Sequence, residues 1–230
     1  MKKLLKVFIV MTAFLFAGTS TLYAEMRNDL VPNLMKENLN GQLRIDEAGT
    51  YILQGNLKGT VVVDPGKGDV ELVLDNATIE GNNGPSIVAL SGDHLKITTT
   101  DNSVNRLLDG GKDSLFNGTV YSMIDTVFDG NGKVDFFAYN DKAVVVENAN
   151  LVFNGGEYDV MSKGYGISVQ GNNRYELVVN DGEFNFFSDK EGFDPNNNAT
   201  FNGGNFNENS LPTDFEQTRQ DSFTPVNQNT

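Results

Sequence analysis

The chain of 230 residues contains no cysteine, a single histidine and a formal net charge of −14 at pH 7. The lack of cysteine excludes disulfides, thiol catalysis and cysteine-ligated metals. So acidic a composition argues against nucleic acid and anionic membranes as partners, because like charges repel, and it suits an extracellular protein or one that binds cations.

Residues 1–24 have the features of a secretory signal peptide. The first six residues include three lysines, residues 7–17 are almost wholly apolar, and Ala24 is a small residue directly before the expected cleavage site. The apolar run is shorter than a membrane span requires, and no second apolar span follows. We therefore expect cleavage after Ala24 and a protein that is secreted, periplasmic or displayed at the cell surface.

The segments that follow read as a cap and then as β-strands. Residues 25–41 carry apolar residues at roughly helical spacing and are expected to form an N-terminal cap or linker. Residues 42–126 hold short β-branched or alternating runs between Gly, Asn and Asp turns. The expected strands are Leu43 to Ile45, Tyr51 to Leu53, Thr60 to Val63, Val70 to Leu74, Ser86 to Leu90 and Leu95 to Thr99. We expect the polar residues 101–117 to leave the sheet as a loop.

The last third of the chain repeats one short unit, which is an apolar strand, an Asn/Asp/Gly corner and a second alternating strand. The units are residues 127–136, 151–160, 177–186 and 199–207. The equivalent glycines, Gly132, Gly156, Gly182 and Gly204, are 24, 26 and 22 residues apart. Such a period with strand and turn content predicts a β-solenoid. Residues 208–230 lose the periodicity and are expected to form a polar C-terminal tail.

The repeat also predicts which side chains face the interior, because side chains alternate along a strand. The inward positions are Val134, Tyr158, Phe184 and Phe206, followed by Phe136, Val160 and Phe186. The outward positions between them are Asp135, Asp159, Asn185 and Asn207. The corner residues Asn154, Asn180 and Asn202 align as well, and we interpret them as structural residues of the turns.

Charged residues gather at the edge that follows the second strand of each unit. This edge carries the carboxylates Asp141, Asp189, Glu191 and Asp194 and the lysines Lys142, Lys163 and Lys190. Neighbouring rungs lie about 4.8 Å apart, so clustered carboxylates repel unless lysines pair with them or a hard cation bridges them. Calcium accepts several oxygen ligands and needs neither Cys nor His. The residues alone leave both interpretations open.

Our specific metal prediction is one Ca²⁺ held by Asp189, Glu191 and Asp194, with Asp141 as a neighbour. Phe193 is expected to point inward and to hold these side chains in fixed directions. Lys190 competes with the metal, because it can neutralise the same carboxylates.

Several segments together resemble the secreted bacterial carbohydrate-binding proteins of the cellulose- and polygalacturonate-binding β-helix type. The matching segments, in the same order, are residues 48–57, 70–79, 120–122 leading into 127–132, and 191–196 leading into 202–204. The resemblance runs from about residue 42 to residue 207. It implies an all-β, right-handed parallel β-helix similar in shape to pectate lyases, with bound calcium and binding of plant-type polysaccharide without cleavage. The family's acidic turn falls on Glu191 and Asp194.

These observations favour an exported, monomeric protein that binds a polysaccharide, either a plant-type glucan or a polyuronate, with help from calcium. Tyr139 and Tyr165 are the candidate aromatic platforms for a neutral sugar, and Lys163 and Lys190 are further candidate ligand-binding residues. One alternative is a calcium-dependent polysaccharide lyase with Lys163 or Lys190 as the base. Another is a structural or adhesive solenoid that has no ligand site.

Overall fold

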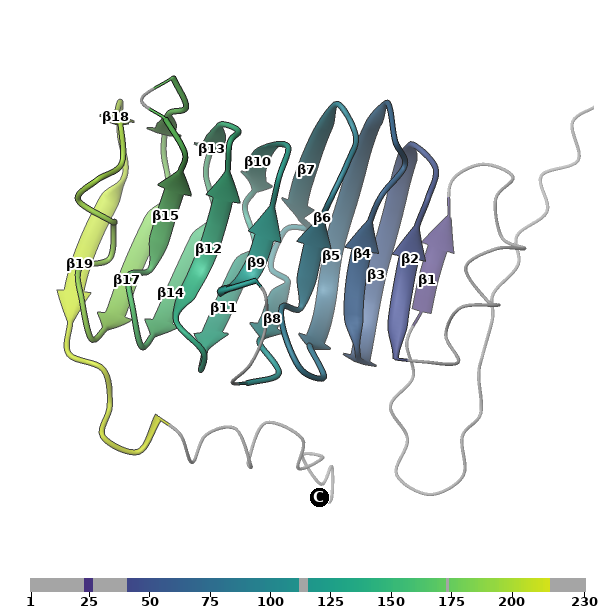
Figure 1. The fold of residues 1–230 in the computed structure, drawn as a ribbon. Helices are drawn as coiled ribbons and strands as arrows, with labels where there is room; N and C mark the ends of the chain where they lie inside the picture. The colour runs from purple at the N-terminus through teal and green to yellow at the C-terminus, as the bar shows by residue number, and fades with distance from the viewer. Residues whose placement is uncertain (1–22, 27–40, 112–115, 173, 216–230) are drawn as a thin grey trace, which may run out of the picture.

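The computed structural model describes residues 23–26, 41–111, 116–172 and 174–215, and it shows parallel strands stacked in a β-solenoid (Figure 1). Each turn of the solenoid, here called a rung, adds one strand to each of three faces. A 13-stranded sheet forms two of the faces, and a six-stranded sheet forms the third. The predicted fold class is thereby confirmed.

The long strands β3 (Gly49–Lys58) and β5 (Asp69–Glu80) bend around a corner and belong to both the first and the second face. The first face continues with β7 (His94–Thr99), β10 (Asp125–Gly130), β13 (Leu151–Phe153), β16 (Leu177–Val179) and β18 (Ala199–Phe201). The second continues with β8 (Val104–Leu108), β11 (Lys133–Ala138), β14 (Glu157–Ser162), β17 (Glu183–Ser188) and β19 (Asn205–Asn209). The third consists of β2 (Gln42–Ile45), β4 (Thr60–Val63), β6 (Ile87–Ala89), β9 (Gly118–Ser122), β12 (Lys142–Glu147) and β15 (Ile167–Gln170). All six strands predicted between residues 43 and 99 are present.

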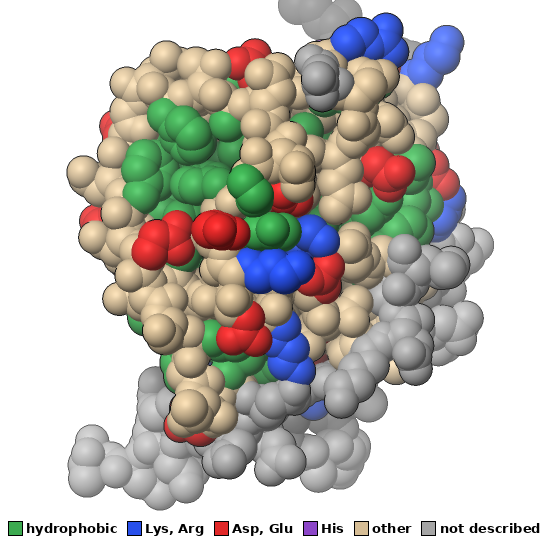
Figure 2. Space-filling model, turned by 60° about the vertical axis from the view of Figure 1, so that its left-hand side comes forward, with side chains coloured by type: hydrophobic (Ala, Val, Ile, Leu, Met, Phe, Trp, Pro, Cys, Tyr) green, Lys and Arg blue, Asp and Glu red, His purple; other side chains and the backbone are tan. Residues whose placement is uncertain are grey.

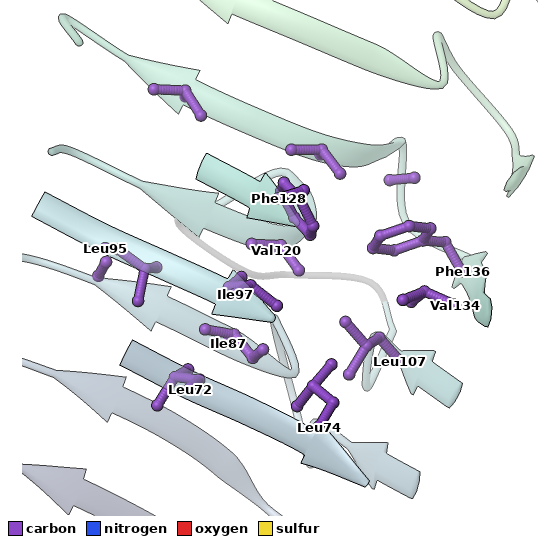
Figure 3. Packing of buried hydrophobic residues seen from close by; sticks show 14 of the residues in the cluster. Leu72, Leu74, Ile87, Leu95, Ile97, Leu107, Val120, Phe128, Val134 and Phe136 are labelled. Carbon is purple, nitrogen blue, oxygen red and sulfur yellow. The ribbon is translucent and has the colours of Figure 1, made fainter. Parts of the chain in front are cut away.

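The core consists of ladders of apolar side chains that the parallel register aligns. On the first face Leu72, Ile97 and Phe128 are register partners in successive rungs, and Phe128 stacks on Phe153 with ring centroids 4.9 Å apart. Figure 3 shows Leu72, Ile97 and Phe128 pointing into the same interior as Val120 of the third face. Removal of this apolar surface from water is the main force that holds the rungs together.

The predicted inward ladders of the second face are confirmed, with one exception. Tyr158, Phe184, Phe186 and their predicted partners are at most 1% exposed, but Phe206 is 38% exposed because no rung lies beyond it. The predicted outward ladder from Asp135 to Asn207 is aligned in register as expected.

The prediction that residues 101–117 leave the sheet is wrong for residues 104–108. This segment contains β8, which lies between β5 and β11 on the second face. The polar Asn105 occupies an inward position, where its Oδ1 accepts from the Ala77 N–H at 2.9 Å and its Nδ2 donates to the Lys133 carbonyl at 3.1 Å. Because its amide is fully bonded, Asn105 is tolerated in the interior, and the polar composition misled the prediction.

The two ends of the solenoid differ. Strand β1 (Tyr23–Met26) pairs antiparallel with the first half of β3, so it adds an edge strand beside the first rung. Tyr23 and Ala24, the last two residues of the predicted signal peptide, lie within β1, whereas residues 1–22 and 27–40 lie outside the described residues. At the other end β18 and β19 form the last rung. Beyond β19 the chain turns back, and Phe215 stacks on Tyr139 with centroids 4.7 Å apart. The predicted tail is therefore partly packed, and residues 216–230 lie outside the described residues.

Candidate functional site

The candidate site lies at the corner between the second and third faces, where one strand ends and the next begins. We call residues 139–142, 163–166 and 189–194 the charged corner. These three segments follow β11, β14 and β17, whose strands are adjacent in the parallel sheet. Every residue predicted to bind ligand or metal lies in it, on three successive rungs. Figure 2 shows Lys and Asp/Glu side chains close together beside an apolar patch on this side of the molecule.

Tyr139 is not an exposed platform for a sugar. Its side chain is 2% exposed, and it stacks on Phe215 and Phe137 with centroids 4.7 and 6.3 Å away. Leu211 packs in the same cluster. The sequence could not show this burial, because the returning C-terminal segment covers an outward position of the second face.

Tyr165 and Lys190 form the most distinctive contact of the corner. The Lys190 ammonium lies 4.8 Å from the centroid of the Tyr165 ring, within the range of a cation–π interaction. The two residues come from consecutive rungs. Tyr165 and the neighbouring Lys163 are partly exposed, whereas Lys190 is exposed. The corner therefore places the Lys190 ammonium over the Tyr165 ring, and Lys163 lies two residues before Tyr165 in the same segment.

Asp141 is held by neighbours on the same edge. Its Oδ2 accepts from the Lys142 ammonium at 2.6 Å and from the Asn117 side-chain amide at 3.3 Å. Gly164 permits this arrangement, because a Cβ at that position would lie 2.0 Å from the Asp141 carboxylate. Asp141 therefore behaves as a lysine-paired turn carboxylate, which is the competing interpretation of the edge.

Asp194 is also held by hydrogen bonds. Its Oδ2 accepts from the Ser168 hydroxyl at 2.8 Å, and its Oδ1 accepts from the backbone and side-chain amide of Asn196 at 3.0 and 2.9 Å. Burial alone would raise the pKa of Asp194, but these hydrogen bonds outweigh burial, so the pKa lies below its usual value. The carboxylate is ionised at neutral pH, and it serves to tie the turn to the preceding rung.

The predicted calcium ligands do not converge. Among the described residues no group of three or more His, Cys, Asp or Glu side chains could hold a metal ion. Asp189 and Glu191 are exposed, whereas both oxygens of Asp194 already accept hydrogen bonds. These residues do not fit a preassembled calcium site.

Sequence reasoning missed three polar residues that shape the corner, which are Asn117, Ser168 and Asn196. The 26-residue step from Ser168 to Asp194 equals one repeat, so the repeat length was the signal that could have paired them. Asn117 lies in the polar segment 101–117, which the sequence predicts to be a loop. His94 lies elsewhere, on the first face, where it is exposed and 2.8 Å from Asp69.

Comparison with known proteins agrees with this architecture. A family model described as carbohydrate-binding domain-containing protein matches residues 40–211. The chain is similar to the solved structure of the polysaccharide lyase-like protein from C. thermocellum, a gadolinium derivative. The TM-score is 0.55 at 20% identity, and the match covers 76% of this chain and 90% of that one. No curated protein matches. In the described part of the chain, no helix is long and apolar enough to cross a membrane.

Proposed function

Because the chain belongs to the family of carbohydrate-binding domain-containing proteins, we propose that it binds an extended polysaccharide at the charged corner, with Tyr165, Lys163 and Lys190 as the contact residues. The observation that carries this proposal is the Lys190 ammonium 4.8 Å over the Tyr165 ring. The sequence features of residues 1–24 support export, so the proposed ligand is an extracellular polymer.

The geometry suits a polymer better than a small ligand. The contact residues come from consecutive rungs about 4.8 Å apart, so a chain that lies along the corner meets a new set of side chains at each step. The Tyr165 ring offers an apolar face to the C–H groups of a sugar ring. The two lysines donate hydrogen bonds to hydroxyls or to uronate carboxylates. They also reduce the repulsion between an acidic polymer and this acidic protein.

The test is affinity electrophoresis of the mature protein through gels that contain polygalacturonate or a soluble β-glucan. Tyr165→Ala and Lys190→Gln should each weaken retention about tenfold, which is about 1.4 kcal/mol of binding free energy. Loss of retention on polygalacturonate alone in Lys190→Gln would identify the acidic polymer as the ligand class. Incubation with each polymer also tests for a lyase, because cleavage would release unsaturated, ultraviolet-absorbing ends.

Matched controls separate the site from general surface effects. Tyr175→Ala removes another partly exposed tyrosine, and Lys67→Gln removes an exposed lysine in the turn between β4 and β5. Both should retain binding. If both controls weaken binding as much as the corner variants do, the corner is not the binding site.

Calcium assistance stays a prediction, and the proposed contacts do not use a metal. If calcium binds, millimolar Ca²⁺ should raise the melting temperature of the wild type, because a ligand that binds only the folded state stabilises that state. The double variant Glu191→Gln/Asp194→Asn should not respond. An unmoved wild-type melting curve, together with calcium-independent retention, would reject the metal and keep the polysaccharide site.

A further inference from the structure

The segment that follows β19 covers one of the three rungs of the charged corner. We call residues 210–215 the strap. The strap turns back from the last rung (Figure 1), and its Phe215 ring stacks on Tyr139 with centroids 4.7 Å apart and an interplanar angle of 17°. Leu211 packs in the same cluster. Because Tyr139 belongs to the charged corner, the strap covers the rung next to the one that carries Lys163 and Tyr165.

The side chains under the strap are apolar although they lie on the outer side of the second face. Phe137 and Met161 are register partners in adjacent strands, and both occupy outward positions of the alternation. Both pack in the cluster that contains Tyr139 and Phe215. We call Phe137, Tyr139 and Met161 the covered patch. It borders the proposed polysaccharide contacts, since Met161 lies two residues before Lys163.

The strap is not part of the solenoid core. The inward residues, such as Phe136 and Val160, form one cluster, which among the described residues includes no member of the strap. The strap and the covered patch form a separate, smaller cluster. Ser210 and residues 212–214 are exposed, so Leu211 and Phe215 are the strap residues that pack. Segments with few buried apolar contacts open at a lower free energy than the core does. The strap can therefore leave while the rungs stay folded.

A bound polymer would meet the strap directly. A polysaccharide that lies along the corner from residues 189–194 to residues 163–166 next reaches residues 139–142, where Phe215 covers Tyr139. The nearly parallel stacking of Phe215 on Tyr139 uses the same ring face that would receive the C–H groups of a sugar ring. The strap and the next sugar of the polymer therefore compete for one surface.

We propose that the strap is a built-in competitor of the polysaccharide, and that an extended polymer displaces it and packs its sugar rings on the covered patch. This inference rests on the proposed function, because it extends the same site by one rung and regulates its affinity. The closed strap lowers the apparent affinity by the fraction of molecules in which the patch is open.

Affinity electrophoresis through gels that contain polygalacturonate or a soluble β-glucan tests the competition. Phe215→Ser should raise the affinity about tenfold, because the strap no longer holds the patch closed. Tyr139→Ala added to Phe215→Ser should abolish this gain. Met123→Ser is the matched control, because it removes a 45% exposed apolar side chain on another part of the surface and should leave the affinity unchanged. Each variant should keep the cooperative unfolding transition of the solenoid.

Hydrogen exchange reads the strap without any substitution. Saturating polymer should speed exchange at residues 210–215 of the wild type and slow it at residues 163–166. If Phe215→Ser binds no more tightly than the wild type, or if bound polymer leaves exchange in the strap unchanged, the competition is wrong and the charged corner remains the site. If neither protein binds either polymer, the proposed function fails and this inference fails with it.

Discussion

Replacement of Phe186 by alanine should destabilise the solenoid strongly. The Phe186 side chain is 0% exposed and lies 4.9 Å from the Phe193 ring and 5.9 Å from the Phe184 ring. It also lies so close to Gly192 that a Cβ there would come within 2.3 Å of the ring. The backbone and the neighbouring rings hold the site open, so the cavity cannot collapse fully. Truncation of a buried Phe costs about 3–5 kcal/mol.

Thermal and urea unfolding followed by far-UV circular dichroism would measure this cost. For a chain of this size about 1 kcal/mol corresponds to a shift of about 2–4 °C, so the melting temperature should fall by about 6–20 °C. Val104→Ala is the control, because Val104 is 48% exposed on the outer side of β8 and should change the free energy of unfolding by less than about 0.5 kcal/mol. If Phe186→Ala costs no more than this control, the inward ladder does not hold the last rungs together.

Three further predictions concern a glycine, a charge network and the histidine. Gly130 and Gly66 both have positive φ, so alanine is strained at either position. A Cβ at Gly130 would lie 2.2 Å from the Thr99 carbonyl oxygen, whereas a Cβ at Gly66 would meet nothing within 4 Å. Gly130→Ala should therefore have a much lower melting temperature than Gly66→Ala. Lys133 bonds Glu157 and Asp159 at 2.8 and 2.7 Å beside Asp135, whose pKa is raised by burial. Lys133→Gln should therefore cost about 1–3 kcal/mol at pH 7 in urea unfolding. The loss should shrink on acidification, because Asp135, whose pKa is raised by burial, becomes protonated and then no longer needs the Lys133 ammonium. The hydrogen bond from His94 to Asp69 raises the pKa of the imidazole above 6.5, so its stabilising effect is complete below pH 6.5 and is lost as pH rises through the higher folded pKa. The single imidazole signal in an NMR titration should move to a lower midpoint in Asp69→Asn, and an unchanged midpoint would exclude the pair.

Much of the fold could be predicted because each rung of a solenoid repeats the same pattern of strand and turn residues. The alternation in residues 151–160 and 177–186 determined both the inward ladder and the outward one, since side chains in a strand must point to opposite sides. The same argument failed for β8, because Asn105 is polar and its burial depends on hydrogen bonds to Ala77 and Lys133 of neighbouring rungs. Composition alone does not show such long-range partners.

Of the contacts in the charged corner, the repeat predicted some and not others. The repeat placed Tyr165 and Lys190 on consecutive rungs of one edge, and the structure brings them together. It could not show that Phe215 covers Tyr139, because that contact joins an aperiodic segment to the repeat. Nor could the repeat show that the Asp194 carboxylate accepts hydrogen bonds from Ser168 and Asn196.

The contact of Phe215 with Tyr139 changes how force would travel through the molecule. In a stack whose rungs touch only their neighbours, tension applied at the C-terminal side would peel the rungs one at a time, beginning with the last. Here the chain leaves β19 and is anchored further back along the second face, so a pull on Phe215 reaches Tyr139 before it reaches β18 and β19. The Phe215–Tyr139 contact would therefore carry the force first, and β18 and β19 would be loaded only after that contact is broken.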